Sequence, residues 1–353
     1  MTLYNRIRSR VGKILVVGAG GYMGRFYMKT LIEGFGIPQS SIIAVDIDSE
    51  HLKEVVELYP SIIQESDVEA AWKHDPSIAI VLVNTPAHLE VLQACSDAGV
   101  QNIFIEKPLV YSPSEIEEVE KLSFKNFFVA YLINFSGVVD RLMEDVIYKG
   151  GLVVLHAMSV WGKNWCAVDR PMGGDAEEEM THPLALIFSV VNDSQTLLGA
   201  NLEADCSYVP FVQPHLLEEA KSLEIVYPDR LNDSTSAVLS MKTEKGDVKA
   251  QLLSSFGMYD QERRVEFTLA RRAGDFPELK VKLLFDVDGE DILLVKDART
   301  NTPHQTFRSS GNKIADQLEA ALIAFAGGEQ DRRLVDIRNA STLVNLLDSA
   351  FAE

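Results

Sequence analysis

Short apolar runs alternate with amphipathic segments over roughly the first 130 residues of the chain. The apolar runs are residues 13–17, 41–45, 78–83, 103–105 and 126–130. Their β-branched and aromatic composition, with no polar alternation, is typical of strands buried on both faces. The segments with a helical period are residues 22–34, 49–58, 87–98 and 113–122. This order of strands and helices predicts an α/β fold with a doubly wound parallel sheet.

The pattern changes after Tyr131. Residues 138–148 predict a helix that ends at two glycines, and beyond it apolar and polar positions alternate with a period of two. Strands are predicted at residues 152–161, 222–227, 236–242, 248–255, 264–269, 279–285 and 291–296, and helices at residues 183–191, 314–325 and 336–351. Turn residues separate the strands. This part is therefore predicted to be an α+β domain with a large, mostly antiparallel sheet.

We expect two domains, residues 1–132 and residues 133–353, because the chain has 353 residues and a domain usually takes about 100–200. The closing helices are free to pack back on the first domain. The sequence shows no internal repeat, low-complexity tract or flexible linker, so we expect the two domains to pack closely with a cleft between them.

Composition excludes several classes of function. A formal net charge of −19 argues against a nucleic-acid partner, because phosphates require a basic face. No apolar run approaches the roughly 18 residues that span a bilayer, and glycines interrupt the first one, so it is a strand rather than a signal peptide. Three widely spaced cysteines suit neither a disulfide framework nor a metal cluster. We predict a cytoplasmic protein with reduced thiols and no metal, nucleic-acid or membrane partner.

A glycine-rich turn, Gly18-Ala19-Gly20-Gly21-Tyr22-Met23-Gly24, follows the first strand and opens the first helix. In this context such a turn binds the pyrophosphate of a dinucleotide. Gly18 permits the tight turn, and Gly20 lets the main chain approach the phosphates. The third glycine, which permits close helix–strand packing, falls one position late at Gly24. We predict that the cofactor contacts Gly18, Gly20, Gly21, Tyr22 and Met23.

Asp46 ends the second predicted strand. An acid at this place binds the hydroxyls of the adenosine ribose and repels a 2′-phosphate. Residues 47–50 contain no Arg or Lys, so NAD is favoured over NADP. Asp48, by contrast, suits a helix cap.

Polar residues also follow the third of these strands. Asn84, Thr85 and Pro86 close it and start a helix. We predict that they lie beside the ribose and amide of the nicotinamide. His88 suits a structural position or the edge of the cofactor site better than acid–base catalysis.

Glu106-Lys107-Pro108 follows the fourth strand. The ligand crevice of an open parallel sheet lies at the carboxyl ends of its strands. Lys107 is therefore placed to reach a bound nicotinamide or the substrate carbon beside it, and Glu106 to contact the cofactor. Pro108 stiffens the turn.

The order of these elements resembles the Gfo/Idh/MocA oxidoreductase family, which includes glucose–fructose oxidoreductase and inositol dehydrogenase. Glu106-Lys107-Pro108 is the most specific element of the resemblance, which extends over the second domain through Lys149-Gly150-Gly151 and the closing helices. The resemblance implies an amino-terminal Rossmann domain and a dehydrogenase that uses NAD(P) and acts on CH–OH groups. It also implies a homodimer or homotetramer, built through the open face of the second-domain sheet.

The same resemblance implies a catalytic trio of a lysine, an aspartate and a histidine. Lys107 matches the lysine and His182 the histidine, while Glu178 replaces the aspartate four residues before it. Met180 replaces the glycine of the family pattern, and Ala185 replaces a further acid. These departures leave the acid–base pair in place but affect contacts with sugar hydroxyls.

The chemistry of these side chains suits hydride transfer from an alcohol. His182 carries an imidazole, which titrates near neutral pH and can accept the hydroxyl proton. Lys107 can bind the same oxygen and stabilise its developing charge, or share the proton. Which of the two is the base stays open, and Glu178 would orient His182 or hold a neighbouring hydroxyl.

The segment between the strand at residues 152–161 and the catalytic histidine is expected to border the substrate. Indole faces stack on sugar rings, which favours Trp161, and Lys163 or Arg170 can bind a carboxylate or phosphate. Tyr131 is a weaker candidate for a substrate contact. Glu179 is expected to be a solvated residue of an acidic loop.

The leading hypothesis is an NAD-dependent oxidoreductase that acts on a secondary alcohol of a sugar, a cyclic polyol or a sugar derivative. One alternative is a redox-assisted lyase or hydrolase of the same family. Another is a non-catalytic NAD-binding regulator, against which the presence of both Lys107 and His182 argues.

Overall fold

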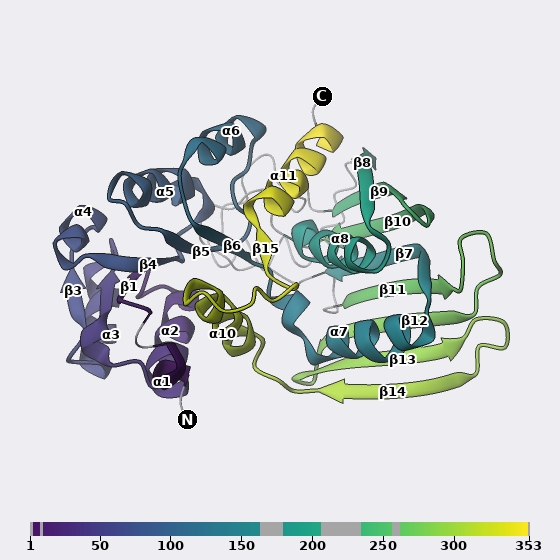
Figure 1. Cartoon of the computed structure of the whole chain (residues 1–353), viewed down its shortest axis with the longest axis horizontal. Coiled ribbons are helices and arrows are strands. Elements are labelled where there is room, and N and C mark those ends of the chain that lie inside the picture. Colours follow the sequence, from purple (N-terminus) through teal and green to yellow (C-terminus); the bar gives the residue numbers. More distant parts are fainter. Residues whose placement is uncertain (1–2, 8–9, 163–178, 206–233, 256–261, 352–353) are drawn as a thin grey trace, which may run out of the picture. The chain divides into compact units, whose positions relative to one another are not determined.

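The computed structural model describes residues 3–7, 10–162, 179–205, 234–255 and 262–351 (Figure 1). The chain divides into two compact units. The first is Met1–Leu132 with Asn312–Val344, and the second is Ile133–Gly311 with Asn345–Glu353. In the described residues no helix combines the length and hydrophobicity needed to cross a membrane.

The first unit is built on a seven-stranded sheet with the order β15-β6-β5-β4-β1-β2-β3. Its strands are β1 (Lys13–Val17), β2 (Ile42–Val45), β3 (Ile63–Glu65), β4 (Pro76–Val81), β5 (Asn102–Glu106), β6 (Asn126–Ala130) and β15 (Val335–Asp336). Every pair is parallel except β15 with β6. The central strands are buried on both faces, which explains their continuous apolar composition. The doubly wound parallel sheet predicted from the sequence is confirmed.

Helices connect these strands and cover the sheet. They are α1 (Leu3–Ile7), α2 (Tyr22–Lys29) with a π-helical continuation Thr30–Gly34, α3 (Ser49–Leu58), α4 (Val68–Ala71), α5 (His88–Asp97), α6 (Pro113–Lys121) and α10 (Lys313–Phe325). Ser112 begins α6 with a capping box, in which its hydroxyl accepts from the Glu115 amide and the Glu115 carboxylate accepts from the Ser112 amide. Reciprocal bonds of this kind satisfy two otherwise unpaired amides and fix where a helix starts.

The end of the chain completes the first unit. β15 pairs with β6 through Val335 and Val129. The ring of Phe325, on α10, stacks on Phe128 of β6 with centroids 5.5 Å apart and an interplanar angle of 18°. The closing segment therefore supplies both an edge strand and part of the core to a sheet whose other strands come from the first 130 residues.

The second unit contains an eight-stranded sheet with the order β14-β13-β12-β11-β7-β10-β9-β8. Its strands are β7 (Val153–Gly162), β8 (Leu197–Asp205), β9 (Ser234–Thr243), β10 (Gly246–Ser255), β11 (Arg263–Ala270), β12 (Leu279–Val287), β13 (Glu290–Asp297) and β14 (Pro303–Ser309). β7 and β10 are parallel and every other pair is antiparallel. The large, mostly antiparallel sheet predicted from the sequence is confirmed.

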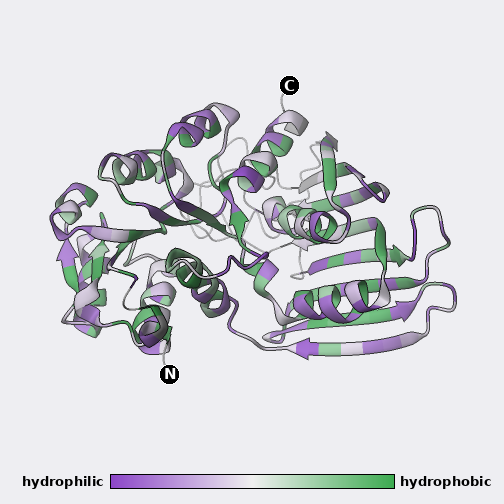
Figure 2. Ribbon diagram, in the orientation of Figure 1, coloured by the Kyte–Doolittle hydropathy of each residue, from purple (hydrophilic) through white to green (hydrophobic). Residues whose placement is uncertain are grey.

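Among the described residues, helices cover one face of this sheet. α8 (Thr181–Gln195) contacts β7, and α7 (Gly137–Arg141), continued by the π-helix Leu142–Tyr148, contacts β13 and β14 (Figure 1). Residues of β10 alternate between buried and exposed along the strand. Hydrophobic and hydrophilic colours alternate along strands of the same sheet in Figure 2. This period of two is the pattern of a sheet with one solvated face. The last helix, α11 (Ile337–Phe351), begins in the first unit.

Sequence patterns missed four strands, and all four lie at the edges of the sheets. β3, β8 and β14 each pair on one side only, and β14 (Pro303–Ser309) is polar and largely exposed. An edge strand need not be apolar on either face, so its sequence carries little hydrophobic signal. β15, two residues long, is also an edge strand and precedes a predicted helix. The predicted strand at residues 222–227 lies outside the described residues.

Loss of the stacked ring between α10 and β6 is expected to destabilise the first unit. Phe325 is 5% exposed, so Phe325→Ala should lower the free energy of unfolding by about 3–5 kcal/mol through lost burial and a residual cavity. Denaturant unfolding followed by circular dichroism measures this. Phe276, which is 79% exposed, provides the control. An equal loss for Phe276→Ala would contradict the assignment of Phe325 to the core.

Candidate functional site

The glycine-rich turn packs between the ends of two strands. The amides of Gly18 and Ala19 donate to the carbonyl oxygen of Val45, at the end of β2, at 2.9 and 3.1 Å. Gly18 has a φ of +83°, and a Cβ there would lie 2.8 Å from the Leu82 carbonyl oxygen. A side chain is therefore excluded both by conformation and by space.

Gly24 has the role predicted for the third glycine. A Cβ on Gly24 would lie 2.1 Å from the carbonyl oxygen of Gly18 and 2.6 Å from that of Ala19. This contact brings the first turns of α2 directly against the turn. The one-residue displacement in the sequence pattern thus preserves the close approach of helix and turn.

Gly20 and Gly21 differ in what surrounds them. A Cβ on Gly20 would lie 2.6 Å from Cβ of His51, so this glycine permits close packing on α3. A Cβ on Gly21 would meet only the Gly18 carbonyl oxygen, at 3.4 Å. The open position beside this turn is therefore at Gly21, which begins α2 in an extended conformation.

The start of α2 suits an anion. In the described structure, no side chain caps this helix and no acidic residue lies in its first turn. The amides that begin a helix carry partial positive charge and point along its axis. Together with the open surroundings of Gly21, this arrangement fits the pyrophosphate of a dinucleotide. Tyr22, which is 78% exposed, and Met23 lie in the same turn.

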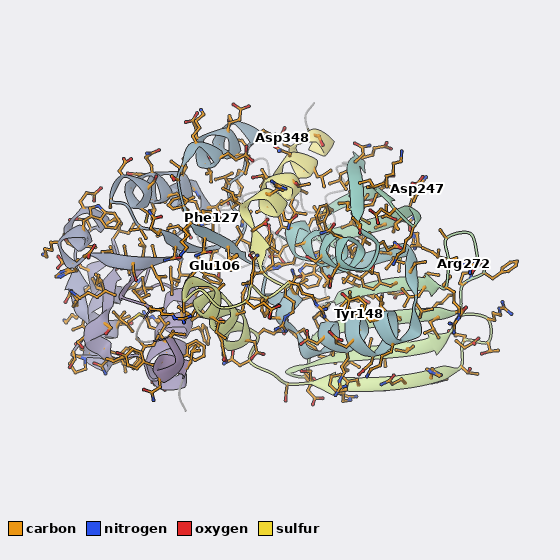
Figure 3. The ribbon with its side chains drawn as sticks, viewed as in Figure 1. Glu106, Phe127, Tyr148, Asp247, Arg272 and Asp348 are labelled. Carbon is orange, nitrogen blue, oxygen red and sulfur yellow. The ribbon has the colours of Figure 1, made fainter. Side chains whose placement is uncertain are left out.

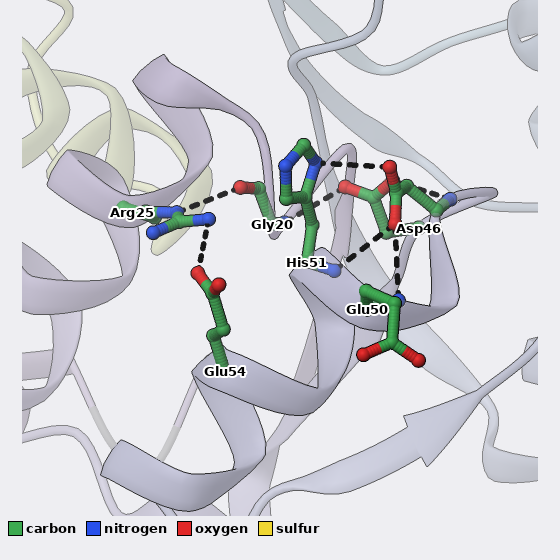
Figure 4. A network of polar contacts seen from close by, with 7 residues as sticks. Gly20, Arg25, Asp46, Glu50, His51 and Glu54 are labelled. Carbon is green, nitrogen blue, oxygen red and sulfur yellow. Dashed lines mark hydrogen bonds and ion pairs between the residues drawn. The ribbon is translucent and has the colours of Figure 1, made fainter.

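Asp46 ties the end of β2 to the glycine-rich turn (Figure 4). One carboxylate oxygen accepts from the Gly20 amide at 2.8 Å, and the other accepts from the Asp48 amide at 2.9 Å. Each oxygen has a second lone pair, so the carboxylate can still accept from ribose hydroxyls. The two main-chain bonds fix its orientation at the edge of the turn.

Charged side chains surround this edge. Arg25 donates to the Gly20 carbonyl oxygen at 2.8 Å and forms an ion pair of 2.6 Å with Glu54 (Figure 4). Asp48 accepts from the amides of Glu50 and His51, which confirms its predicted role as a helix cap. The hydrogen bond from the His51 amide is the main cause of the lowered pKa of Asp48.

The segment after β4 presents polar residues at the carboxyl edge of the sheet. Thr85 starts a short 3₁₀ turn, Thr85–Ala87, and is buried. Asn84 and Pro86 are exposed. Their predicted contacts with the nicotinamide stay a prediction, and their position at a strand end is compatible with it.

His88 begins α5 and is fully buried. Its Nδ1 lies 2.9 Å from the Leu109 carbonyl oxygen, and its Nε2 lies 3.1 Å from the Val83 carbonyl oxygen. Carbonyl oxygens only accept, so the ring nitrogen that carries the proton donates to one of these two oxygens. The ring connects the segment after β4 with the turn after Lys107-Pro108, which is a structural role.

Glu106 ends β5, where Figure 3 labels it, and Lys107 is the next residue. The Glu106 carboxylate accepts from the hydroxyl of Tyr27 and from the Lys107 amide, both at 3.3 Å. Tyr27 is fully buried on α2, and burial, followed by the charge of Glu106, raises the pKa of its phenol well above the usual value. The peptide bond between Lys107 and Pro108 is cis. Sequence reasoning missed Tyr27, whose only signal was its helical spacing from the glycine-rich turn.

Tyr131 follows β6 and is 1% exposed. Burial raises the pKa of its phenol. Its hydroxyl has no hydrogen-bond partner in the described part of the chain. Tyr131, for which a substrate contact was predicted, therefore has an enclosed side chain.

The predicted residues of the second unit fall into two groups. Lys163, Arg170 and Glu178 lie outside the described residues. Trp161 and His182 are described, and their rings lie 5.7 Å apart. Trp161 is the next-to-last residue of β7 and His182 lies in the first turn of α8, so two separate elements bring these residues together.

Glu179 corrects the sequence interpretation. It was expected to be a solvated loop residue, but it is 3% exposed and accepts a hydrogen bond of 3.1 Å from Trp161 Nε1. The local run of acids suggested a solvated surface, while the partner indole lies on a distant strand. Within the described residues, no group of three His, Cys, Asp or Glu side chains could hold a metal ion.

Residues 12–127 match the family model GFO_IDH_MocA, described as an oxidoreductase family with an NAD-binding Rossmann fold. This match confirms the resemblance drawn from the sequence, over the part of the chain that it covers. A search of curated proteins gave no match.

Solved structures share the fold over nearly the whole chain. UDP-N-acetylglucosamine 3-dehydrogenase from Acidithiobacillus ferrooxidans is 15% identical, with a TM-score of 0.69 and 96% of each chain covered. Levoglucosan dehydrogenase in complex with NADH and levoglucosan is 14% identical, with a TM-score of 0.72 and coverage of 97% of this chain and 96% of the other. Biliverdin reductase from Synechocystis sp. PCC 6803, in complex with biliverdin and NADP⁺, is 12% identical, with a TM-score of 0.65 and coverage of 96% and 98%. At sequence identities this low, the comparison shows a shared fold and nothing more.

A side chain at Gly24 is expected to force α2 away from the glycine-rich turn. Gly24→Ala should lower the free energy of unfolding by roughly 1–3 kcal/mol, because the methyl group would overlap main-chain atoms that cannot rotate away. Gly34→Ala, in the π-helical continuation of α2, is the matched control, since its Cβ would meet only the Thr30 side chain at 3.8 Å. Urea unfolding of the two variants measures the difference. Equal stabilities would contradict the close packing at Gly24.

Proposed function

We propose that this chain, whose residues 12–127 carry the NAD-binding Rossmann fold of the Gfo/Idh/MocA oxidoreductase family, transfers a hydride between a secondary alcohol and NAD. The observation that carries the proposal is the edge formed by Asp46 and the uncapped start of α2. A carboxylate fixed for ribose hydroxyls lies there beside amides oriented toward an anion. When bound, the nicotinamide would supply the hydride acceptor.

NAD is favoured over NADP by the charge around Asp46. The Asp46 carboxylate would repel a 2′-phosphate, and residues 47–50 offer no cation to attract one. Arg25 does lie close to Gly20, but it is paired with Glu54. Structures that share this fold include complexes with NADH and with NADP⁺, so the fold leaves the choice to local residues.

The proposed substrate is a sugar, a cyclic polyol or a sugar derivative. Two proteins with the same fold are dehydrogenases of levoglucosan and of UDP-N-acetylglucosamine. A biliverdin reductase also shares the fold, so the fold restricts the substrate only through the residues of the site. Hydroxyl groups on a ring could form hydrogen bonds with Lys107, Glu178 and His182, which the family resemblance assigns to the site.

We assign the proton to His182 and the developing charge on the oxygen to Lys107. An imidazole can accept the hydroxyl proton as the carbon loses its hydride, and an ammonium group can stabilise the oxygen. Glu178 is assigned to orient His182 or to bind a neighbouring hydroxyl. The presence of both Lys107 and His182 favours an enzyme over a non-catalytic regulator. A redox-assisted lyase would begin with the same hydride transfer.

We also infer a homo-oligomer that forms through the open face of the second-unit sheet. Leu253 and Val238 are exposed on neighbouring strands of that sheet, at 42% and 38%. Apolar side chains on a solvated sheet face are typical of surfaces that associate. β14, at one edge of this sheet, is polar and largely exposed.

Substitution of Lys107 is expected to separate binding from turnover. Lys107→Ala should lower kcat by at least about a hundredfold, because it removes the group that stabilises charge on the reacting oxygen, while the affinity for NADH changes little. Absorbance at the NADH band against a panel of inositols, aldoses, amino sugars and nucleotide sugars measures turnover, and NADH fluorescence measures binding. Lys121→Ala, on an exposed side chain of α6, is the control. Unchanged turnover in Lys107→Ala would refute the assignment.

The preference for NAD is expected to depend on the charge of Asp46. Asp46→Asn keeps an acceptor for the Gly20 amide but removes the repulsion of a 2′-phosphate. The ratio of kcat/KM for NAD to that for NADP should fall by about tenfold or more, since opposed like charges cost several kcal/mol. Initial rates with both cofactors measure the ratio. Asp48→Asn, two residues after Asp46, should leave the ratio unchanged, and an equal change there would contradict the proposal.

A further inference from the structure

Trp161 contacts both Glu179, which lies two residues before α8, and His182, in the first turn of that helix. Its ring lies 5.7 Å from that of His182, with an interplanar angle of 31°, and its Nε1 donates to Glu179 at 3.1 Å. The other sides of the indole meet Phe285, at 5.7 Å, and the Arg263 guanidinium, at 5.9 Å. The side chain is 2% exposed. All five residues belong to the second unit, and they enclose the indole in one cluster.

Glu179 is a charged residue in buried surroundings. At 3% exposure its carboxylate has lost most of its water, which is unfavourable unless hydrogen-bond donors replace it. The indole N–H of Trp161 is such a donor, and a bond to an ionised acceptor is stronger than one between neutral groups. An apolar side chain would fill the same space at a lower desolvation cost. The carboxylate therefore points to a role beyond packing.

The bond to Glu179 can fix the plane of the indole. Rotation about the bond that joins a tryptophan ring to Cβ has broad minima, and the indole has a single N–H, which points in one direction. Once that direction is set, the face of the ring toward His182 is set as well.

We propose that Glu179, acting through Trp161, is a positioning residue for His182. The carboxylate fixes the indole, and the indole holds the imidazole in one orientation. The use of His182 as the proton acceptor rests on the proposed function. In that reaction the O–H bond of the alcohol would break and an N–H bond would form on His182. The C–H bond would break as the carbon becomes a carbonyl carbon, and a bound NAD would accept the hydride, while Glu179 and Trp161 exchange no proton.

The contact between the two rings can be tested without a substrate. In ¹³C-labelled protein, the His182 ring resonance is identified by its loss in His182→Gln, and the nearby indole displaces it through its ring current. Glu179→Leu removes the acceptor and should move the resonance toward the value of a free histidine. Glu179→Gln, whose amide oxygen can still accept from the indole, should restore it. Trp72→Phe is the control for a tryptophan in the first unit.

Turnover provides the second measurement, with the substrate that the sugar panel identifies. Glu179→Leu should lower kcat roughly ten- to a hundredfold, as expected for a displaced catalytic group, with KM within about twofold. Glu179→Gln should recover kcat to within roughly threefold of the parent. Trp161→Phe, which keeps an aromatic ring but lacks the N–H, should resemble Glu179→Leu in both measurements.

The outcomes separate this proposal from the proposed function. An unmoved His182 resonance in a folded Glu179→Leu variant would overturn the positioning role. If that variant fails to fold, an unmoved resonance in Trp161→Phe would overturn it equally. A moved resonance that Glu179→Gln restores supports the role. The His182 resonance could also move and be restored in this way in a protein that reduces NAD with no member of the panel. That outcome would still support the positioning role and would contradict only the proposed function.

Discussion

The contact between Gly24 and the main chain of Gly18 and Ala19 determines the geometry on which the proposed cofactor site depends. Because Gly24 has no side chain, α2 and the glycine-rich turn lie closer together than any other residue would permit. The first amides of α2 then lie beside the turn, and the Gly20 amide lies within reach of Asp46. The site is thus a consequence of main-chain packing, and its few side chains refine a shape that the backbone has already set.

Two further interactions extend this rigidity along the sheet edge. His88 links the segment after β4 to the turn after Lys107-Pro108, and Tyr27 connects α2 with Glu106. Both side chains are buried, so water does not compete for their partners. The strand ends that carry the predicted cofactor residues are therefore connected to one another through the interior of the first unit as well as through the ladder of the sheet.

The sequence was most informative where burial is two-sided. Continuous apolar runs predicted β1, β2, β4, β5 and β6, and glycine spacing predicted the turn and the role of Gly24. It was least informative for edge strands such as β14, which bury little, and for contacts between distant elements. Glu179 shows the second limit: four acidic residues in the stretch from 175 to 179 suggest solvent, and only the fold reveals the indole of Trp161. Local composition reports the average surroundings of a segment, whereas the partner of a single buried charge depends on topology.

The place of β15 and α10 in the first unit has a consequence for how the chain is made. A ribosome delivers residues 1–132 long before residues 312–344, yet the first sheet needs the later segment to pair β6 and to cover Phe128. During synthesis the nascent first unit therefore carries an open strand edge and an exposed aromatic ring, which are the features that chaperones recognise and that promote misassembly. A fragment cut at Leu132 would keep this immature surface permanently, so the boundary suggested by linear sequence is a poor place to divide the protein.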